Sequence, residues 1–302
     1  MSKELLFRGA ATALVTPFCD RTVDFHSLGN LIEEQIAQSI DALVICGTTG
    51  EASTLSDEER RACIRFTVEK AAGRVPVIAG CGANATARAV ALSRYADEVG
   101  VDGILVVTPY YNKATPAGLI SHYRKIADAV HVPLILYNVP SRTGVDLPIP
   151  VCKELSRHER IVGIKEASGN LNKISEIAAV CGDDLPIYSG DDGLILPVLS
   201  VGGVGVISVV SNLLPHTVHD ICAKWFANDP TASAKTALAL YPLIRALFAE
   251  VNPVPLKYAM QLCGKCGGEL RLPLCPASEE TKAHLREILA QTEELFYEDD
   301  LK

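Results

Sequence analysis

The sequence lacks the long apolar runs, basic tracts and export signal that would connect it with a membrane, with nucleic acid or with secretion. Its 302 residues contain no window that approaches the apolar length needed to span a bilayer. Residues 1–8 contain no apolar segment of the kind that a signal peptide requires. No run of Lys and Arg stands out and the net charge is −8, so neither nucleic acid nor an anionic membrane is an expected partner. We therefore expect a cytoplasmic protein.

The sequence also lacks a recognisable metal-binding pattern. Asp191 and Asp192 have no His or third carboxylate beside them, so they are predicted to cap a helix rather than to bind a metal. The 10 cysteines are scattered through apolar segments and are expected to be reduced. The single CxxC motif, at Cys263 and Cys266, has neither the further ligands of a zinc site nor the context of a redox motif. We expect no metal and no cofactor.

What the sequence does contain is a regular alternation of short apolar runs and helical patterns. No two of the runs are joined by a hairpin signal, so parallel pairing through helical crossovers is expected. The predicted strands cover residues 9–15, 42–46, 75–79, 103–107, 133–137, 161–165, 186–189 and 204–209. We predict an α/β fold, a (β/α)8 TIM barrel. A doubly wound open sheet is the alternative, but the Gly-rich phosphate turn that usually accompanies it is missing.

The strand pattern stops near residue 230. Residues 231–251, 256–262 and 279–296 have helical patterns. Pro253 and Pro255 lie between the first two segments and separate them. We predict two domains, a catalytic barrel over residues 1–230 and an all-helical C-terminal domain over residues 231–302. Within the barrel, residues 27–40 are predicted to form an amphipathic helix, and Ser56 with the acidic residues after it is predicted to begin the next helix.

Lys165 ends the predicted strand 161–165, whose other residues are apolar or glycine. An ammonium group at the end of a buried strand is poorly solvated, and desolvation favours the neutral amine. A neutral lysine is a nucleophile towards carbonyl carbon. The alternative is a lysine that only ends the strand and extends to solvent.

Polar, glycine and aromatic residues gather at the carboxyl ends of the predicted strands. In a barrel these ends converge on one face, where substrates bind. The residues expected to line one pocket there are Thr48, Thr49, Tyr111, Tyr137, Arg142, Lys165 and Gly190.

Each of these residues also has a structural interpretation. Thr48 and Thr49 either form a simple turn or present hydroxyl and N–H groups to a small carboxylate. Tyr137 is either a core aromatic or a general acid/base beside Lys165. Arg142 is either a solvated loop residue or a bidentate clamp for a substrate carboxylate.

Six motifs connect the chain with a known family. They are GTTGE at 47–51, TPYYNK at 108–113, YNVPSRTG at 137–144, IKEASG at 164–169, SGDD at 189–192 and GVIS at 205–208. Any one of them is a weak signal, whereas six in order at predicted strand ends are specific. The chain thereby resembles the dihydrodipicolinate synthase family of pyruvate-dependent class I aldolases, from about residue 9 to its helical tail.

The resemblance implies an activity, the committed step of the diaminopimelate route to lysine. Lys165 would form a Schiff base with pyruvate, and the resulting enamine would attack the aldehyde of L-aspartate 4-semialdehyde. Tyr137, Thr48 and Tyr111 match the family's proton relay. The family's equivalent of Tyr111 enters the neighbouring subunit's site, which implies a homo-oligomer, a tetramer built from two tight dimers.

The resemblance also assigns substrate-binding positions. Thr49 matches the position that holds the pyruvate carboxylate, and Arg142 matches the clamp on the semialdehyde carboxylate. Gly190 and Ile207 match positions that contribute backbone groups around Lys165. An N-acetylneuraminate lyase-like aldolase or keto-acid dehydratase is the alternative enzyme, although these relatives lack the arginine. A non-catalytic keto-acid-binding paralogue is the remaining alternative.

One departure from the family pattern concerns regulation by lysine. Asn84 and Tyr110 match the allosteric positions of lysine-inhibited members. Asp57, Arg60 and Arg88 stand where those members have histidines and a glutamate, and Arg88 would oppose the cationic amino group of lysine. Weak or absent inhibition by lysine is therefore expected.

Overall fold

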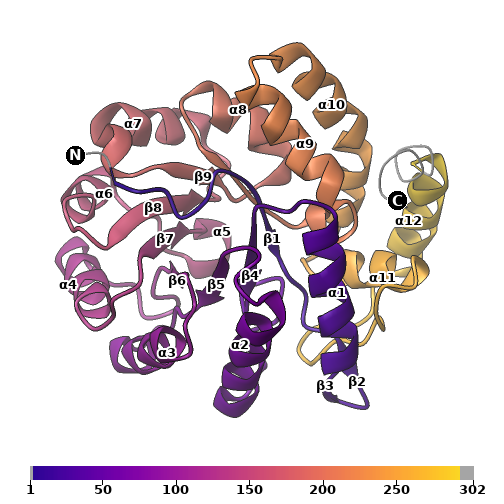
Figure 1. Cartoon of the computed structure of the whole chain (residues 1–302), viewed down its shortest axis with the longest axis horizontal. Helices are drawn as coiled ribbons and strands as arrows, with labels where there is room; N and C mark the ends of the chain where they lie inside the picture. Colours follow the sequence, from indigo (N-terminus) through magenta and orange to yellow (C-terminus); the bar gives the residue numbers. More distant parts are fainter. Residues whose placement is uncertain (1–2, 293–302) are drawn as a thin grey trace. The chain divides into compact units, whose positions relative to one another are not determined.

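The strands of the computed structural model, which describes residues 3–292, form one closed barrel of eight parallel strands in the order β1, β10, β9, β8, β7, β6, β5, β4. Figure 1 labels the helices and strands where there is room. The barrel strands are β1 Gly9–Ala13, β4 Ala42–Ile45, β5 Val77–Gly80, β6 Gly103–Val107, β7 Leu134–Asn138, β8 Ile161–Glu166, β9 Ile187–Ser189 and β10 Gly205–Ser208. Each overlaps a predicted strand. The predicted (β/α)8 barrel is confirmed.

One hairpin was not predicted from the sequence. Strands β2 (Phe18–Cys19) and β3 (Thr22–Val23) pair in antiparallel fashion. The two residues of the turn, Asp20 and Arg21, have φ values of 49° and 64°. Such a turn usually contains Asn or Gly, so its sequence gave no hairpin signal. This hairpin lies outside the eight predicted strands, and none of those eight is joined to another by a hairpin.

The helices alternate with the barrel strands and then continue alone after β10. They are α1 Phe25–Ala37, α2 Asp57–Ala71, α3 Thr86–Glu98, α4 Pro116–Ala127, α5 Pro140–Thr143, α6 Ile149–Leu155, α7 Leu171–Cys181, α8 Ile195–Ser200, α9 Pro215–Phe226, α10 Pro230–Leu247, α11 Val254–Leu262 and α12 Glu279–Gln291. Three short 3-10 helices are η1 Gly182–Asp184, η2 Asp192–Leu194 and η3 Val210–Asn212. Within residues 3–292, no helix is long and apolar enough to cross a membrane.

Local sequence explains where several helices begin. Ser56 starts α2 as predicted: its hydroxyl accepts from the Glu59 N–H, and the Glu59 side chain accepts from the Ser56 N–H. Helix α1 begins earlier than predicted, because the Asp24 carboxylate accepts from the Ser27 N–H and caps the helix. The predicted tail helix is confirmed as α12, and residues 293–296 lie outside the described residues. The division at residue 230 into two domains stays a prediction.

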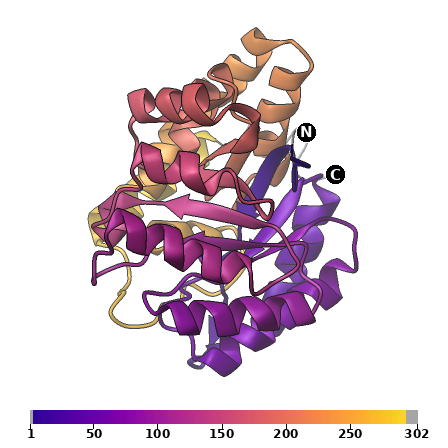
Figure 2. The same ribbon diagram turned by 90° about the vertical axis from the view of Figure 1, so that its left-hand side faces the viewer.

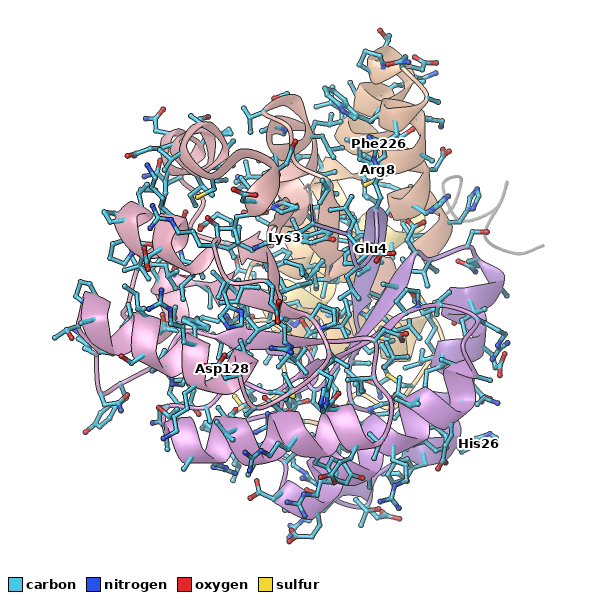
Figure 3. The ribbon with its side chains drawn as sticks, turned by 60° about the vertical axis from the view of Figure 1, so that its left-hand side comes forward. Lys3, Glu4, Arg8, His26, Asp128 and Phe226 are labelled. Carbon is cyan, nitrogen blue, oxygen red and sulfur yellow. The ribbon has the colours of Figure 1, made fainter. Side chains whose placement is uncertain are left out.

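The chain divides into two compact units, of which the first contains residues 3–9 and Pro76–Ile207. Its strands β5 to β9 pair in sequence order. Helices α3, α4, α6 and α7 pack side by side, and Figure 2 turns this group toward the viewer. Lys3, labelled in Figure 3, ties the N-terminal segment to this unit because its ammonium donates to the carbonyls of Ser156, His158 and Ile161.

The second unit contains Ala10–Val75 and residues 208–292. Strands β1 and β4 pair in parallel, with Thr12 opposite Leu43. Helix α1 packs on α2, and α10 packs on α9, α11 and α12. The C-terminal helices therefore form a connected group within this unit.

Candidate active site

Lys165 and Tyr137 lie opposite each other at the carboxyl ends of two paired strands. The register of β7 and β8 sets Tyr137 against Lys165. Both side chains are buried, with 5% of Lys165 and 7% of Tyr137 exposed. The Lys165 Nζ atom lies 4.6 Å from the centroid of the Tyr137 ring. The structure therefore brings the predicted nucleophile and the predicted acid/base residue together, away from bulk water.

Gly190 follows β9 and leaves space beside Lys165. Its N–H donates to the Glu166 carbonyl at 2.8 Å. A Cβ atom at this position would lie 2.6 Å from the Ala167 Cβ and 3.0 Å from the Lys165 Cε. Glycine is required here because any side chain would displace the lysine or its strand. Ile207 lies within β10 and is fully buried, at 0% exposure.

Arg142 and Tyr111 are exposed residues of the first unit. Arg142 lies in α5, which ends at Gly144 in the left-handed conformation with φ 68°. Tyr111 has φ 73°, a strained value for an aromatic residue, and 90% of it is exposed. The Tyr111 side chain is therefore not packed against the buried Lys165 of the same chain.

Thr48 and Thr49 follow β4 in the second unit, in a loop with unusual backbone conformation. Cys46 and Glu51, which flank them, have positive φ values of 56° and 51°. Thr49 is buried, and its hydroxyl oxygen accepts from Asn252 Nδ2 at 2.9 Å. Because this oxygen receives a hydrogen bond, the Thr49 O–H is left to act as a donor. A hydroxyl donor at this point agrees with a carboxylate-binding role.

A buried ion pair anchors the same loop. Lys257 Nζ lies 2.5 Å from Glu51 Oε1, and both side chains are 0% exposed. Glu51 also accepts from the Arg271 N–H at 3.1 Å, and Lys257 donates to the Glu269 carbonyl at 2.9 Å. Burial lowers the pKa of Lys257, and the Glu51 carboxylate opposes that shift. Sequence reasoning missed this pair; its only signal was a lysine inside the apolar run of α11.

The remaining polar motifs have structural explanations. Asp191 caps η2 by accepting from the Gly193 N–H at 2.9 Å, as predicted. Burial raises the pKa of the Cys266 thiol to about 11, and it also raises the pKa of Cys263. Both thiols are thus protonated at neutral pH. Among residues 3–292, no cluster of three or more His, Cys, Asp and Glu side chains is arranged to hold a metal ion.

The closed parallel barrel carries a buried lysine near the carboxyl end of β8, the barrel face on which the active sites of (β/α)8 enzymes lie. Residues 6–292 match the Dihydrodipicolinate synthetase family. The chain belongs to this family.

Relatives in sequence and in structure agree with this assignment. A 4-hydroxy-tetrahydrodipicolinate synthase of Caldicellulosiruptor saccharolyticus is 51% identical over 286 residues, which cover 94% of this chain and 96% of that protein. The solved structure of the synthase from Methylacidiphilum fumariolicum SolV has a TM-score of 0.94 and 42% identity, covering 96% of this chain and 97% of that one. A chloride-inhibited dihydrodipicolinate synthase from Acinetobacter baumannii, complexed with pyruvate, has a TM-score of 0.93 and 40% identity, covering 95% and 99%.

Proposed function

We propose that the chain condenses pyruvate with L-aspartate 4-semialdehyde, which is the reaction of a 4-hydroxy-tetrahydrodipicolinate synthase. The observation that carries this proposal is the buried Lys165 with its amine 4.6 Å from the Tyr137 ring. Membership of the Dihydrodipicolinate synthetase family supports it. So does the Acinetobacter relative that holds pyruvate.

The first half of the proposed reaction occurs on Lys165. Its neutral amine attacks the keto carbon of pyruvate, a C–N bond forms, and the carbonyl oxygen leaves as water to give an iminium. The iminium withdraws electrons from the neighbouring methyl group, so a methyl proton leaves and an enamine forms. Tyr137 and Thr48, with Tyr111, are proposed to move these protons. Thr49 is proposed to bind the pyruvate carboxylate, and Gly190 and Ile207 are proposed to contribute backbone groups around the adduct.

The second half joins the two substrates. The enamine carbon attacks the aldehyde carbon, the aldehyde oxygen takes a proton, and the C=N bond to Lys165 is restored. The amino group of the adduct then replaces the lysine nitrogen as the ring closes, so one water is released in the whole reaction. Arg142 is proposed to hold the semialdehyde carboxylate, since a guanidinium matches a carboxylate in bidentate geometry.

Borohydride trapping tests the covalent step. The protein is incubated with pyruvate, reduced with borohydride and digested, and the adduct is located by mass spectrometry. We expect one reduced pyruvate adduct on Lys165, and none in the Lys165→Arg variant. Wild-type protein without an adduct at Lys165 would remove both the synthase and the alternative aldolases.

Arg142 distinguishes the synthase from the alternative aldolases. Arg142→Ala is expected to lower kcat/KM for aspartate semialdehyde by about 10- to 100-fold while pyruvate trapping is unchanged, because only the second substrate loses a charge-assisted bond. Arg157→Ala, which removes another exposed arginine, is the matched control. Equal damage to trapping and turnover, or cleavage of a sugar acid by the wild type, would favour an N-acetylneuraminate lyase-like enzyme.

Tyr111 leads to a proposal about assembly. A relay tyrosine that is 90% exposed in its own chain is suited to completing the site of a second copy, so we propose a tight dimer and a tetramer of two such dimers. Tyr111→Phe and Lys165→Ala variants are each expected to be inactive. Purified mixed dimers are expected to regain about half of the activity, because one of the two sites in each mixed pair is intact, and the whole co-expressed population is expected to regain roughly a quarter. No regained activity in verified mixed dimers would place Tyr111 in its own chain's site.

Two further properties follow from particular residues. We propose weak or absent feedback by lysine, because Asp57, Arg60 and Arg88 depart from the inhibited pattern; inhibition at micromolar lysine in a steady-state assay would refute this. We also propose a cytoplasmic location, since all 10 cysteines are free and reduced thiols are typical of that compartment.

A further inference from the structure

A second pair of polar side chains follows Tyr137 and Lys165 at the next register position of β7 and β8. Asn138 and Glu166 are the next residues of β7 and β8, and the register sets them opposite each other. Because successive side chains of a strand point to opposite faces, Asn138 and Glu166 project away from the face that carries the reactive pair. Both are buried, at 0% and 1% exposure.

Asn138 is the centre of a hydrogen-bond network that joins three segments. Its Nδ2 atom donates to Glu166 Oε2 at 2.9 Å and to Asp146 Oδ1 at 2.8 Å. Its Oδ1 atom accepts from the Leu147 N–H at 2.9 Å. One amide therefore links β7, β8 and the segment that follows α5, the helix of Arg142.

The two ends of the network, Glu166 and Asp146, each have a further partner besides Asn138. Glu166 Oε1 accepts from the Ser168 N–H at 2.7 Å, which ties the carboxylate to the turn after β8. Asp146 forms an ion pair with Lys173 of α7. The backbone adds a parallel connection, because the Ala167 N–H donates to the Asn138 carbonyl at 2.9 Å. The Glu166 arm thus holds the strand end of Lys165, and the Asp146 arm holds the segment beside Arg142.

We propose that Asn138, Glu166 and Asp146 are positioning residues, with one arm for each half-reaction. The Glu166 arm sets Lys165 against Tyr137 for attack on the keto acid. The Asp146 arm sets the Arg142 segment for the second substrate. This inference rests on the proposed roles of Lys165 and Arg142. Its physical basis is that a displacement of about 1 Å in a reacting group lowers a rate by roughly 100-fold.

Three variants separate the two arms. Glu166→Gln keeps the size of the side chain but sets an NH2 group against a donor, the Asn138 NH2 or the Ser168 N–H. It is expected to slow pyruvate trapping by about 10- to 100-fold, with KM for aspartate semialdehyde unchanged. Asp146→Asn is expected to leave trapping at the wild-type rate and to raise that KM by about tenfold. Asn138→Ala is expected to show both defects.

A buried hydrogen bond within the second unit provides the matched control. The Ser233 hydroxyl in α10 is fully buried and donates to the Ile221 carbonyl at 2.6 Å. Ser233→Ala is expected to lower the urea midpoint without changing trapping or KM. A merely structural network would behave like this control, or would damage both half-reactions equally.

The outcomes also separate this inference from the proposed site. Wild-type protein that traps no pyruvate on Lys165 overturns the site, and the inference with it. Wild-type trapping together with an unchanged rate in folded Glu166→Gln overturns only the inference. If Glu166→Gln does not fold, Asp146→Asn decides: a raised KM with unchanged trapping supports the inference, and any other result overturns it.

Discussion

Removal of the Lys257 ammonium is expected to destabilise the protein by about 3–5 kcal/mol, because a fully buried carboxylate loses its counter-charge. Glu51 and Lys257 are both 0% exposed and lie 2.5 Å apart. In Lys257→Met the Glu51 carboxylate still accepts from the backbone N–H of Arg271, at 3.1 Å, but it loses the ammonium that neutralises its charge. The ammonium also lies 4.1 Å from the Phe18 ring centroid, a contact of about 1–2 kcal/mol that is lost as well.

The stability lost in Lys257→Met is expected to return when the Glu51 charge is removed as well. Replacing a buried pair by neutral residues of similar size is often neutral, since the desolvation penalty of both ions disappears. Lys257→Met combined with Glu51→Gln is therefore expected to recover at least half of the stability lost in Lys257→Met. The recovery is a coupling that only directly interacting residues show.

Urea unfolding, followed by the fluorescence of the single tryptophan, Trp225, measures these differences at a fixed protomer concentration. Lys70→Met, which breaks an exposed pair with Glu33, is the control and is expected to leave the urea midpoint unchanged. A loss below about 1 kcal/mol in Lys257→Met would show that the pair behaves as if solvent-exposed. A double variant no more stable than Lys257→Met would show that the stranded carboxylate is not the cause.

Three further outcomes are expected. The hydrogen bond that the His219 imidazole donates to the Asp41 carboxylate raises the pKa of His219 above 6.5. The pair's stability, up to about 1 kcal/mol, is complete below that value and disappears as the pH rises through the raised pKa, so the difference in urea midpoint between wild type and His219→Gln should shrink as the pH rises above about 6.5; a constant difference would contradict this. Gly190→Ala should slow borohydride trapping on Lys165 by about tenfold or more in folded protein, as Cε would lie 3.0 Å from the new Cβ; normal trapping would refute the steric argument. In the native protein only the exposed thiols should react with a thiol reagent at neutral pH, and peptide mapping should find Cys19, Cys263 and Cys275.

The barrel could be predicted because its signals are local and repeated. Each strand is a short apolar run buried on both faces, and each is followed by a helix or a polar loop. Ser56 shows the same for a helix terminus, since the cap and its Glu59 partner are three residues apart in the chain. Counting such units is sufficient to set the strand ends of Lys165 and Tyr137 beside each other, as the register shows.

The supporting contacts could not be predicted because they depend on tertiary placement. Glu51 and Lys257 carry no sequence signal that they meet, and an isolated glutamate in a Gly/Thr turn is usually solvated. Asn138 stands next to Tyr137 in a recognisable motif, yet its three hydrogen bonds depend on Asp146, Leu147 and Glu166 arriving from other segments. Tyr111 was assigned to a relay by resemblance alone, and only its 90% exposure shows that its own chain does not enclose it.

Two buried glutamates each lie within two residues of a predicted site residue. Glu51 ends the segment that contains Thr48 and Thr49, and Glu166 directly follows Lys165. Burying a carboxylate costs several kcal/mol in general, and a well-packed apolar residue would often stabilise the fold as much or more. Stability therefore does not explain why a charge stands at both points. A carboxylate has two oxygens in fixed geometry: Glu166 accepts from Asn138 and Ser168, and Glu51 accepts from the Arg271 N–H and pairs with Lys257, so each holds a chain in one place where an apolar side chain permits sliding. Fixed geometry at these two points agrees with the roles that we propose for Lys165 and Thr49.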